Sequence, residues 1–165
     1  MGRIVPCALG ALVYERKLAL GLRAKEPCLG LWNAPGGKQE PLEFSFEGVS
    51  RAFHQDPIQT IEKEYREETG LEVIAHDLLY SSARSAPEAH NSKTYVINMF
   101  LCELKEGQHF KDYDISRVCN EAGIPEFKEY VLFSYDELLS YHSEGKLVDH
   151  IGELLVPELH RRKLI

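Results

Sequence analysis

Residues 61–71 read IEKEYREETGL and cover the second half and the end of the clearest predicted helix of the chain, Asp56 to Gly70. Asp56 suits the N-cap position, and Gly70 suits the left-handed residue that ends a helix. At 3.6 residues per turn, Ile61 and Tyr65 lie on one apolar stripe along this helix. A helix with a single apolar stripe predicts a layered fold in which the helix packs on a sheet.

Three carboxylates, Glu64, Glu67 and Glu68, stand at positions i, i+3 and i+4 beside that stripe. Like charges at these spacings repel by a few tenths of a kcal/mol per pair, and the last turn of a helix disfavours carboxylates. A divalent cation would turn this repulsion into coordination, and carboxylate oxygens suit Mg²⁺ or Mn²⁺. The alternative is a solvated acidic face that Lys63 and Arg66 partly neutralise.

A glycine-rich segment upstream of the helix favours the metal interpretation. Residues 33–38 read NAPGGK, and Glu40 and Glu43 follow them. Consecutive glycines let backbone amides and carbonyls approach a ligand, and Lys38 can contact a phosphate.

Composition limits the class of protein. The 165 residues are about one domain, and 44% apolar with 27% charged residues is typical of a globular chain. A net charge of −7 argues against a nucleic-acid duplex as partner. The longest uncharged and mostly apolar run, Ile4–Tyr14, is too short for a membrane span, and no export signal is visible. The widely spaced cysteines indicate reduced thiols and a cytoplasmic location; they are Cys7, Cys28, Cys102 and Cys119.

Strands and helices are predicted without strict alternation, which favours an α+β or a layered α/β/α domain. The predicted strands are Ile4–Tyr14, Leu18–Leu22, a short one within Leu29–Gly37, Leu71–Leu79, Thr94–Leu104 and Tyr130–Phe133. The other predicted helices are Asp136–Tyr141 and Val148–Arg162, the latter interrupted or restarted around Pro157.

These motifs together resemble the Nudix box, whose signature reads G, five residues, E, seven residues, REUxEExGU, with U an aliphatic residue. Gly37, Glu43 and the segment Lys63–Leu71 carry the match. The spacer from Glu43 to Lys63 is nineteen residues rather than seven, which predicts an insertion at 44–55 within a single domain spanning 1–165. Lys63 replaces the family's arginine, and Tyr65 takes the aliphatic position. The resemblance implies an α/β fold, the Nudix α/β/α sandwich with a mixed central sheet.

Nudix enzymes hydrolyse nucleoside diphosphates linked to another group X, using Mg²⁺ or Mn²⁺. The resemblance implies that Glu64, Glu67 and Glu68 bind the metal together with the carbonyl of Gly36, and that one of these glutamates activates or orients the water. The arginine that Lys63 replaces makes a charged contact that orients the loop and a catalytic glutamate. Lysine keeps the charge but loses the bidentate fork.

A later glutamate often completes the family's metal or base set. Residues 126–138, EFKEYVLFSYDEL, resemble that stretch, and Glu126 and Glu129 are both candidates. Glu103, near the end of a predicted strand, is a third. Surface salt bridging is the alternative role for each.

Two further segments bear on the substrate. Residues 20–23, LGLR, resemble the strand that ends in a phosphate-contacting Arg23 in nucleoside triphosphate hydrolases of the family. Trp32 and Asn33 resemble residues of members that act on oxidised purine nucleotides, where the asparagine reads the base; the alternative is that they only pack and turn. Pro87 lies about where ADP-ribose hydrolases carry a proline.

The predicted partner is thus a small nucleotide, with no duplex and no membrane. Hydrolysis of a nucleoside triphosphate to monophosphate and pyrophosphate is the first expectation. A pyrophosphatase for ADP-ribose or another nucleotide sugar, or a catalytically weak binding module, is the alternative. The insertion at 44–55 or the tract 105–124 could form a lid or a homodimer contact.

Overall fold

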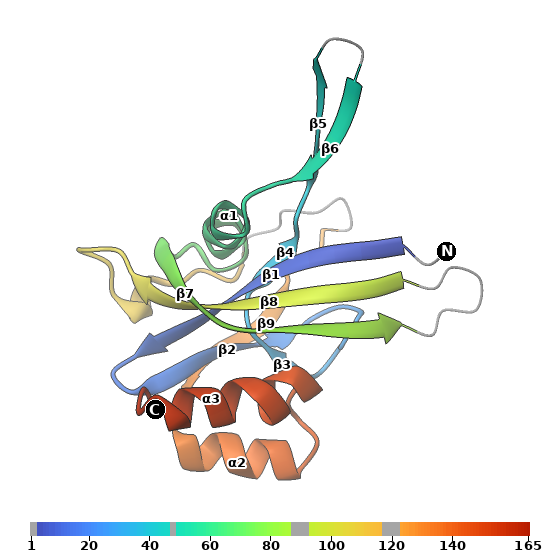
Figure 1. Ribbon diagram of the computed structural model, residues 1–165. Helices are drawn as coiled ribbons and strands as arrows, with labels where there is room; N and C mark the ends of the chain where they lie inside the picture. The colour runs from blue at the N-terminus through green and yellow to red at the C-terminus, as the bar shows by residue number, and fades with distance from the viewer. Residues whose placement is uncertain (1–2, 47–48, 87–92, 117–122) are drawn as a thin grey trace.

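A mixed sheet forms the middle of the molecule in the computed structural model, which describes residues 3–46, 49–86, 93–116 and 123–165 (Figure 1). Within these residues the sheet has seven strands. Its main path runs in the order β3 (Trp32–Asn33), β2 (Lys17–Arg23), β1 (Arg3–Tyr14), β8 (Lys93–Leu104) and β7 (Val73–Ala86). β4 (Gly36–Lys38) pairs with β1, and β9 (Phe127–Phe133) pairs with β2. β1 and β8 are parallel, whereas the other pairings are antiparallel.

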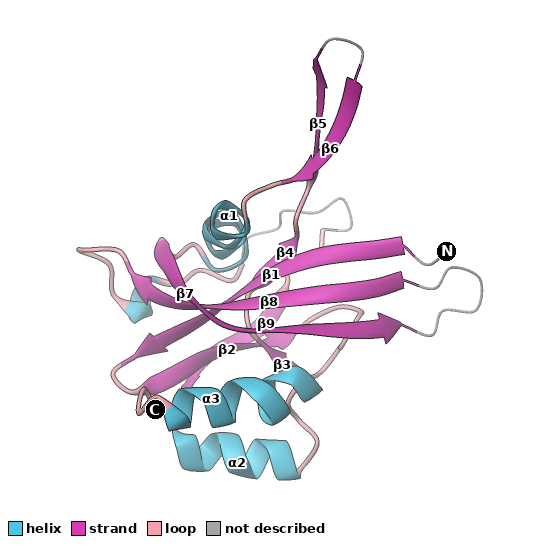
Figure 2. Ribbon diagram, viewed as in Figure 1, coloured by secondary structure: helices cyan, strands magenta, loops and turns pink. Residues whose placement is uncertain are grey.

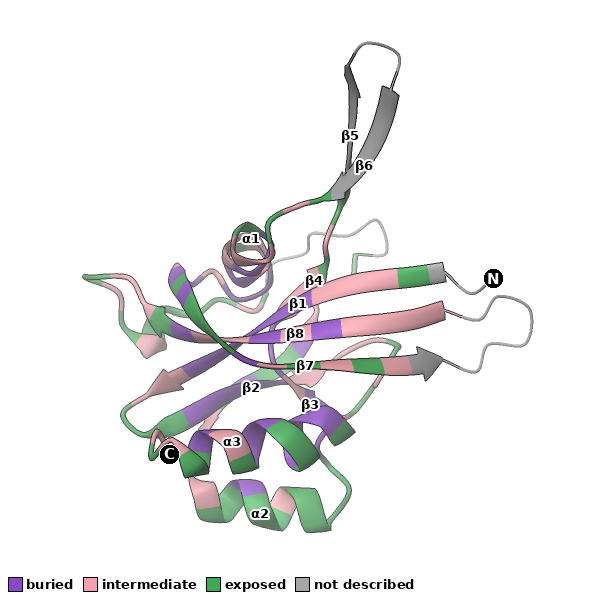
Figure 3. Ribbon diagram, viewed as in Figure 1, coloured by how far each residue is buried: buried purple, intermediate pink, exposed green. Residues whose placement is uncertain are grey.

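Helices cover both faces of this sheet (Figure 2). α1 (Pro57–Thr69) lies on one face, and α2 (Tyr135–Ser143) and α3 (Val156–Arg161) lie on the other. The side chains of β1 alternate between the two layers, because Ala8 and Leu12 join the cluster under α1 while Leu9 joins the cluster under α2 and α3. Figure 3 shows the resulting buried stretches of β1 and β2. The predicted α/β/α sandwich with a mixed central sheet is confirmed.

The predicted helix 56–70 is confirmed as α1, together with both of its ends. The Asp56 carboxylate accepts a hydrogen bond from the amide of Ile58 at 2.8 Å, and Gly70 is left-handed at φ 72°. Tyr65 is fully buried, and its hydroxyl donates to the carbonyl of Gly10 at 2.7 Å. α1 is therefore fixed against the middle of β1.

Several elements differ from the prediction. β7 continues to Ala86 rather than ending at Leu79. The predicted helix 148–162 is divided into the π-helical turn η2 (Ile151–Leu155) and α3, with Pro157 in the first turn of α3. A proline fits there because its missing amide has no intrahelical partner in the first turn of a helix.

The remaining segments form local structures. Most of the predicted insertion at 44–55 lies in a separate two-stranded hairpin of β5 (Pro41–Phe46) and β6 (Val49–His54) that projects from the body in Figure 1. The tract after β8 contains a short 3-10 helix, η1 (Phe110–Asp112), whose Phe110 stacks on Tyr130 at 5.4 Å between ring centroids.

The described cysteines, Cys7, Cys28 and Cys102, are free thiols, whereas Cys119 lies outside the described residues. Within the described chain, no helix is both long and apolar enough to cross a bilayer.

We predict that Gly10→Ala lowers the free energy of unfolding by about 1–3 kcal/mol, because overpacking of this size has such a cost. A Cβ at this position would lie 2.6 Å from Cε2 of Tyr65 and 2.8 Å from Cγ2 of Ile61. Urea unfolding followed by circular dichroism measures the change. Ala83→Val, on an exposed position of β7, is the control that adds carbon without a clash. Equal stability of Gly10→Ala and wild type would contradict the close packing of α1 on β1.

Candidate functional site

The last turns of α1 lie directly on the backbone of β4. The amide of Gly36 donates to Oε2 of Glu68 at 3.2 Å. Gly37 leaves no room for a side chain, since its Cβ would collide with the Glu64 carboxylate. Gly36 has a φ of 150°, and a Cβ there would lie 2.6 Å from Cα of Leu9. The two glycines thus bring backbone groups close to the carboxylates, whereas the predicted approach of this backbone to a ligand stays a prediction.

The electrostatics of this contact are unfavourable in the absence of a cation. Burial raises the pKa of Glu68 well above its usual range, and the nearby Glu64 carboxylate raises it further. Burial also raises the pKa of Glu64, and the charge of Glu67 adds to the effect. The amide of Gly36 offsets only part of the cost for Glu68, whose exposed fraction is 8%. Burial and the neighbouring carboxylates therefore disfavour the charged forms of both Glu64 and Glu68 beside β4.

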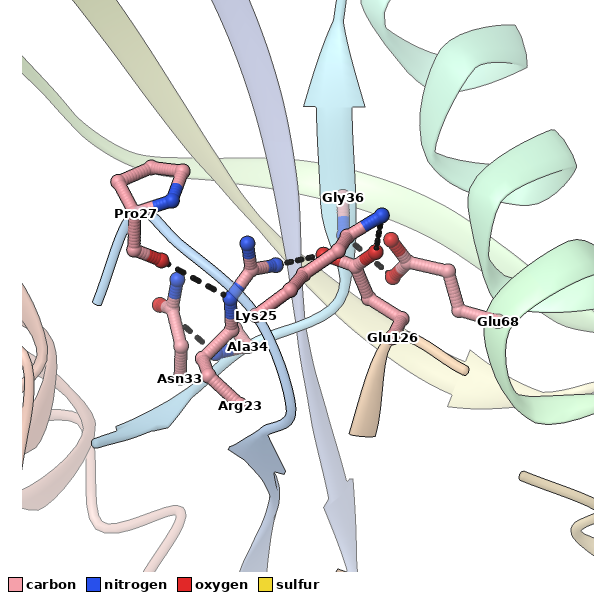
Figure 4. Close-up of polar contacts among 8 residues, drawn as sticks. All are labelled: Arg23, Lys25, Pro27, Asn33, Ala34, Gly36, Glu68 and Glu126. Carbon is pink, nitrogen blue, oxygen red and sulfur yellow. Dashed lines mark hydrogen bonds and ion pairs between the residues drawn. The ribbon is translucent and has the colours of Figure 1, made fainter. Parts of the chain in front are cut away.

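A third carboxylate, Glu126, comes from the residue before β9 (Figure 4). It forms ion pairs with Arg23 and with Lys25, the latter at 2.5 Å. The Arg23 and Glu126 side chains are only 11% and 12% exposed. Arg23 and Lys25 also act on the Glu68 carboxylate, so this ion-pair cluster adjoins the contact between α1 and β4.

The other predicted acidic and basic residues lie in different surroundings. Lys63 forms an ion pair with Glu40 at 2.9 Å, between β4 and β5, which keeps a charged contact from α1 to the glycine segment. Glu129 and Glu103 are exposed on β9 and β8. The structure thus brings Glu126 to the ion-pair cluster beside Glu68, whereas a metal-binding role for Glu129 stays a prediction.

A cavity of about 430 Å³ adjoins the glycine segment. Arg23, Asn33 and Lys38, the predicted substrate-binding residues, all line it. Oδ1 of Asn33 accepts a hydrogen bond from the amide of Ala34 at 2.9 Å, so Asn33 also shapes its own turn. The neighbouring Trp32 is a core residue that packs edge-on against Phe133, with 4.8 Å between ring centroids.

Other lining residues carry no motif that sequence analysis could have used. Arg84 lies on β7 and forms an ion pair with Asp149 at 2.9 Å, and the buried His150 follows at the start of η2. Burial lowers the pKa of His150 to about 4, with the charge of Arg84 as a further cause. The apolar part of the wall comes from four segments that lie far apart in the sequence, and they contribute Leu9, Leu31, Ile97 and Val148.

Comparisons with known proteins agree with this fold. A family model described as the NUDIX domain matches residues 6–151. A MutT protein from Methanosarcina mazei Go1 is similar in structure with a TM-score of 0.69 and 18% identity, over 98% of this chain and 97% of that one. A NUDIX hydrolase from Nitrosomonas europaea gives 0.64 and 20%, over 99% and 74%. The NUDIX domain of Shewanella oneidensis NrtR, solved with ADP-ribose, gives 0.54 and 17%, over 99% and 89%. The comparison with curated proteins gives no significant sequence match.

We predict that Glu68→Gln stabilises the metal-free protein at pH 8 by about 1–3 kcal/mol, because it removes a buried charge that is incompletely paired. Since the pKa of Glu68 is raised in the folded state, the folded protein binds more protons than the unfolded chain. The wild type therefore recovers stability as pH falls, and the advantage of the variant shrinks.

Denaturant unfolding with a chelator at pH 8 and pH 5.5 tests this expectation. Glu62→Gln, a half-buried neighbour on α1, is the matched control. A Glu68→Gln variant that is less stable than wild type at pH 8 would show that the carboxylate is well compensated without metal.

Proposed function

The chain belongs to the Nudix family, and from this we propose that it hydrolyses the phosphoric anhydride of a nucleoside diphosphate linked to another group, with the aid of a divalent cation. The observation that carries the proposal is the pair of carboxylates, the half-buried Glu64 and the buried Glu68, held against Gly36 and Gly37 beside the cavity. A cation would relieve their repulsion, and the cavity gives a substrate direct access to the same glycines.

The donor chemistry fits a hard cation such as Mg²⁺ or Mn²⁺. In the described part of the chain, no three side chains of His, Cys, Asp or Glu converge on one point. Mg²⁺ sites commonly use one or two carboxylates together with water and substrate phosphates, so a partial protein set is sufficient. We propose that the ligands that would hold it come from among Glu64, Glu67, Glu68 and the carbonyl of Gly36. When bound, the cation would neutralise phosphate charge and lower the pKa of a bound water.

The residues of the chain then have distinct roles. Glu64 is suited to accept the proton of the attacking water, because burial brings the pKa of its carboxyl upward, closer to neutral pH. Glu67, which acts on Glu64 electrostatically, assists in ordering that water. The Lys63–Glu40 pair adds an exposed charged contact between α1 and the residue that precedes β5.

The positively charged side chains along the cavity would bind the phosphates of the substrate. Arg23 and Lys38 line it, and a phosphate there would compete with Glu126 for Arg23. Glu126 is therefore the candidate late carboxylate that the surroundings support best, because it lies in the ion-pair cluster next to Glu68. If a substrate phosphate took its place at Arg23, the Glu126 carboxylate would be able to contact the proposed metal site.

A nucleoside triphosphate, cleaved to monophosphate and pyrophosphate, is the substrate we favour, because Asn33 lines the cavity and can present an amide to a base edge. ADP-ribose is the second candidate, since the NrtR domain with this fold binds it. Pro87, which suggests that substrate in the sequence, lies outside the described residues.

We further propose that residues 1–165 form one domain, with the hairpin of β5 and β6 as its insertion and a homodimer contact as one use for it. The free thiols support a reducing, cytoplasmic location.

We predict that Glu64→Gln and Glu68→Gln each lower metal-dependent turnover by about 100-fold or more, the range expected when a positioned acid–base or metal-binding group is lost. Glu62→Gln, on the same helix, should keep wild-type turnover. The measurement is release of nucleoside monophosphate with Mg²⁺ or Mn²⁺. Unchanged turnover in both site variants would refute the proposed hydrolysis.

A substrate panel separates the remaining alternatives. We expect pyrophosphate from nucleoside triphosphates, oxidised purines included, when phosphate and pyrophosphate are quantified separately. AMP from ADP-ribose, with no pyrophosphate from triphosphates, would instead assign the second candidate. Tight nucleotide binding without turnover across the panel would favour a binding module.

A further inference from the structure

The hairpin of β5 and β6 separates its residue types onto two faces. Because its strands are antiparallel, directly paired residues lie on the same face, and successive pairs lie on opposite faces. One face holds proline, alanine and polar residues, in the pairs Pro41–His54, Glu43–Ala52 and Ser45–Ser50. The other holds five large apolar residues and one cation, in the pairs Leu42–Phe53, Phe44–Arg51 and Phe46–Val49. We call this second face the apolar face of the hairpin.

Within the part of the chain that the structure describes, no further strand joins this hairpin. β5 and β6 pair only with each other, and Figure 1 shows them projecting away from the central sheet and α1. A single two-stranded hairpin is marginally stable at best in water, and more strands or a second packed layer are needed to stabilise it. The apolar face therefore requires a layer that covers it.

The base of the hairpin is fixed to the body, so the chain's own cavity does not supply that layer. Nε2 of Gln39 donates to the carbonyl of Gln55 at 2.6 Å, and the amide of Gln55 donates to the carbonyl of Glu40 at 2.8 Å. The amide of Gln39 also donates to the carbonyl of Pro6 on β1 at 2.9 Å. Asp56, the N-cap of α1, follows Gln55 directly. Folding the hairpin onto the cavity would break these hydrogen bonds.

Charge favours a second copy of the same chain as the occupant of the apolar face. Residues 41–54 carry a formal charge of −1, from two glutamates and one arginine, whereas the whole chain carries −7. Two acidic bodies repel each other, but two nearly neutral hairpins that project from them can meet at little electrostatic cost. A face that is the same on both copies can pair with itself about a two-fold axis, which is the commonest symmetry of protein dimers.

The size of the apolar face fits a small but stable interface. A covered phenylalanine buries about 150–250 Å². The three phenylalanines of this face, together with Leu42 and Val49, bring it to roughly the 600 Å² per partner found at the lower end of stable interfaces. Two such hairpins packed face to face would give each of them the second layer that it lacks.

We propose that the apolar face of the β5–β6 hairpin is a dimer interface, at which two copies of the chain pack their hairpins face to face about a two-fold axis. The inference rests on the homodimer contact proposed above, to which it adds the face and the residues that form it. It is independent of the proposed hydrolysis, because neither the interface nor its test requires turnover.

Sedimentation velocity of the full chain over a range of concentrations tests this interface. The 18.8 kDa chain should sediment as a dimer. In Phe44→Glu, which places a charge on the apolar face, the dissociation constant of the dimer should rise about 30-fold or more, as expected when a residue that dominates an interface is lost. Ser45→Glu is the matched control, because it adds the same charge at the next residue, on the opposite face, and it should remain dimeric.

The possible failures are distinguishable. A dimer that survives Phe44→Glu, or that Ser45→Glu disrupts equally, would overturn the assigned face and leave a homodimer in place. A wild type that is monomeric throughout would overturn the homodimer as well. In that case, turnover slowed by Phe44→Glu and not by Ser45→Glu would show that the hairpin covers its own cavity, whereas unchanged turnover in both variants would assign the face to a different protein.

Hydrogen exchange on the wild type avoids dependence on a variant that folds poorly. The amides of β5 and β6 should exchange more slowly at high than at low protein concentration, because only the paired form covers the hairpin. Exchange in the hairpin that does not change with concentration, while the chain dimerises, would overturn the proposal. Failure of the proposed hydrolysis is recognised separately, by turnover that survives in Glu64→Gln and Glu68→Gln.

Discussion

The contact of two carboxyl groups, the half-buried Glu64 and the buried Glu68, with the backbone of β4 is the constraint on which the rest of the site depends. A Cβ on Gly37 would meet the Glu64 carboxylate, and a Cβ on Gly36 would collide with Ala8 and Leu9 of β1, so the two glycines let β4 lie close to both β1 and the carboxylates of α1. The same closeness removes both carboxylates from water, which raises the pKa of each. The fold therefore accepts an electrostatic cost at this point, and the large hydrophobic contact of α1 with the sheet offsets it. Because this packing already holds the carboxylates together, a cation that binds them would not have to overcome the cost of bringing them there.

The position of this contact is fixed by the buried side of α1, which packs on the sheet. Tyr65 is one residue after Glu64, and its hydroxyl holds the carbonyl of Gly10 from within the core. Since β1 also pairs with β4, any shift of α1 along β1 would move the carboxylates off the glycines. One residue of the signature thus serves packing, while its neighbour Glu64 is a proposed metal ligand. The family's aliphatic position accepts tyrosine here because the narrow Gly10 leaves space for the ring.

Local signals made part of this structure predictable from the sequence. Asp56 and Gly70 mark the ends of α1 through caps that involve only nearby residues, and the spacing of the glutamates follows from the helical repeat. The surroundings of Glu126 and His150 were not predictable in this way. Glu126 meets Arg23 across 103 residues of sequence, and His150 meets the cavity through the packing of η2 on β7. Such contacts depend on the tertiary structure, and neither the residue types nor their local spacing indicates them.

The structure shows what the lysine at position 63 changes physically in comparison with the arginine of the motif. An arginine at this place would add a fork of donors, whereas Lys63 makes one ion pair with Glu40. That pair is largely exposed, so it contributes about 1 kcal/mol at most. The buried contacts of Tyr65 with Gly10 and of Glu68 with Gly36 already set the distance between α1 and β4. Because these contacts do not involve residue 63, the weaker lysine pair is compatible with an ordered catalytic centre, and it gives little support to a chain that only binds nucleotides.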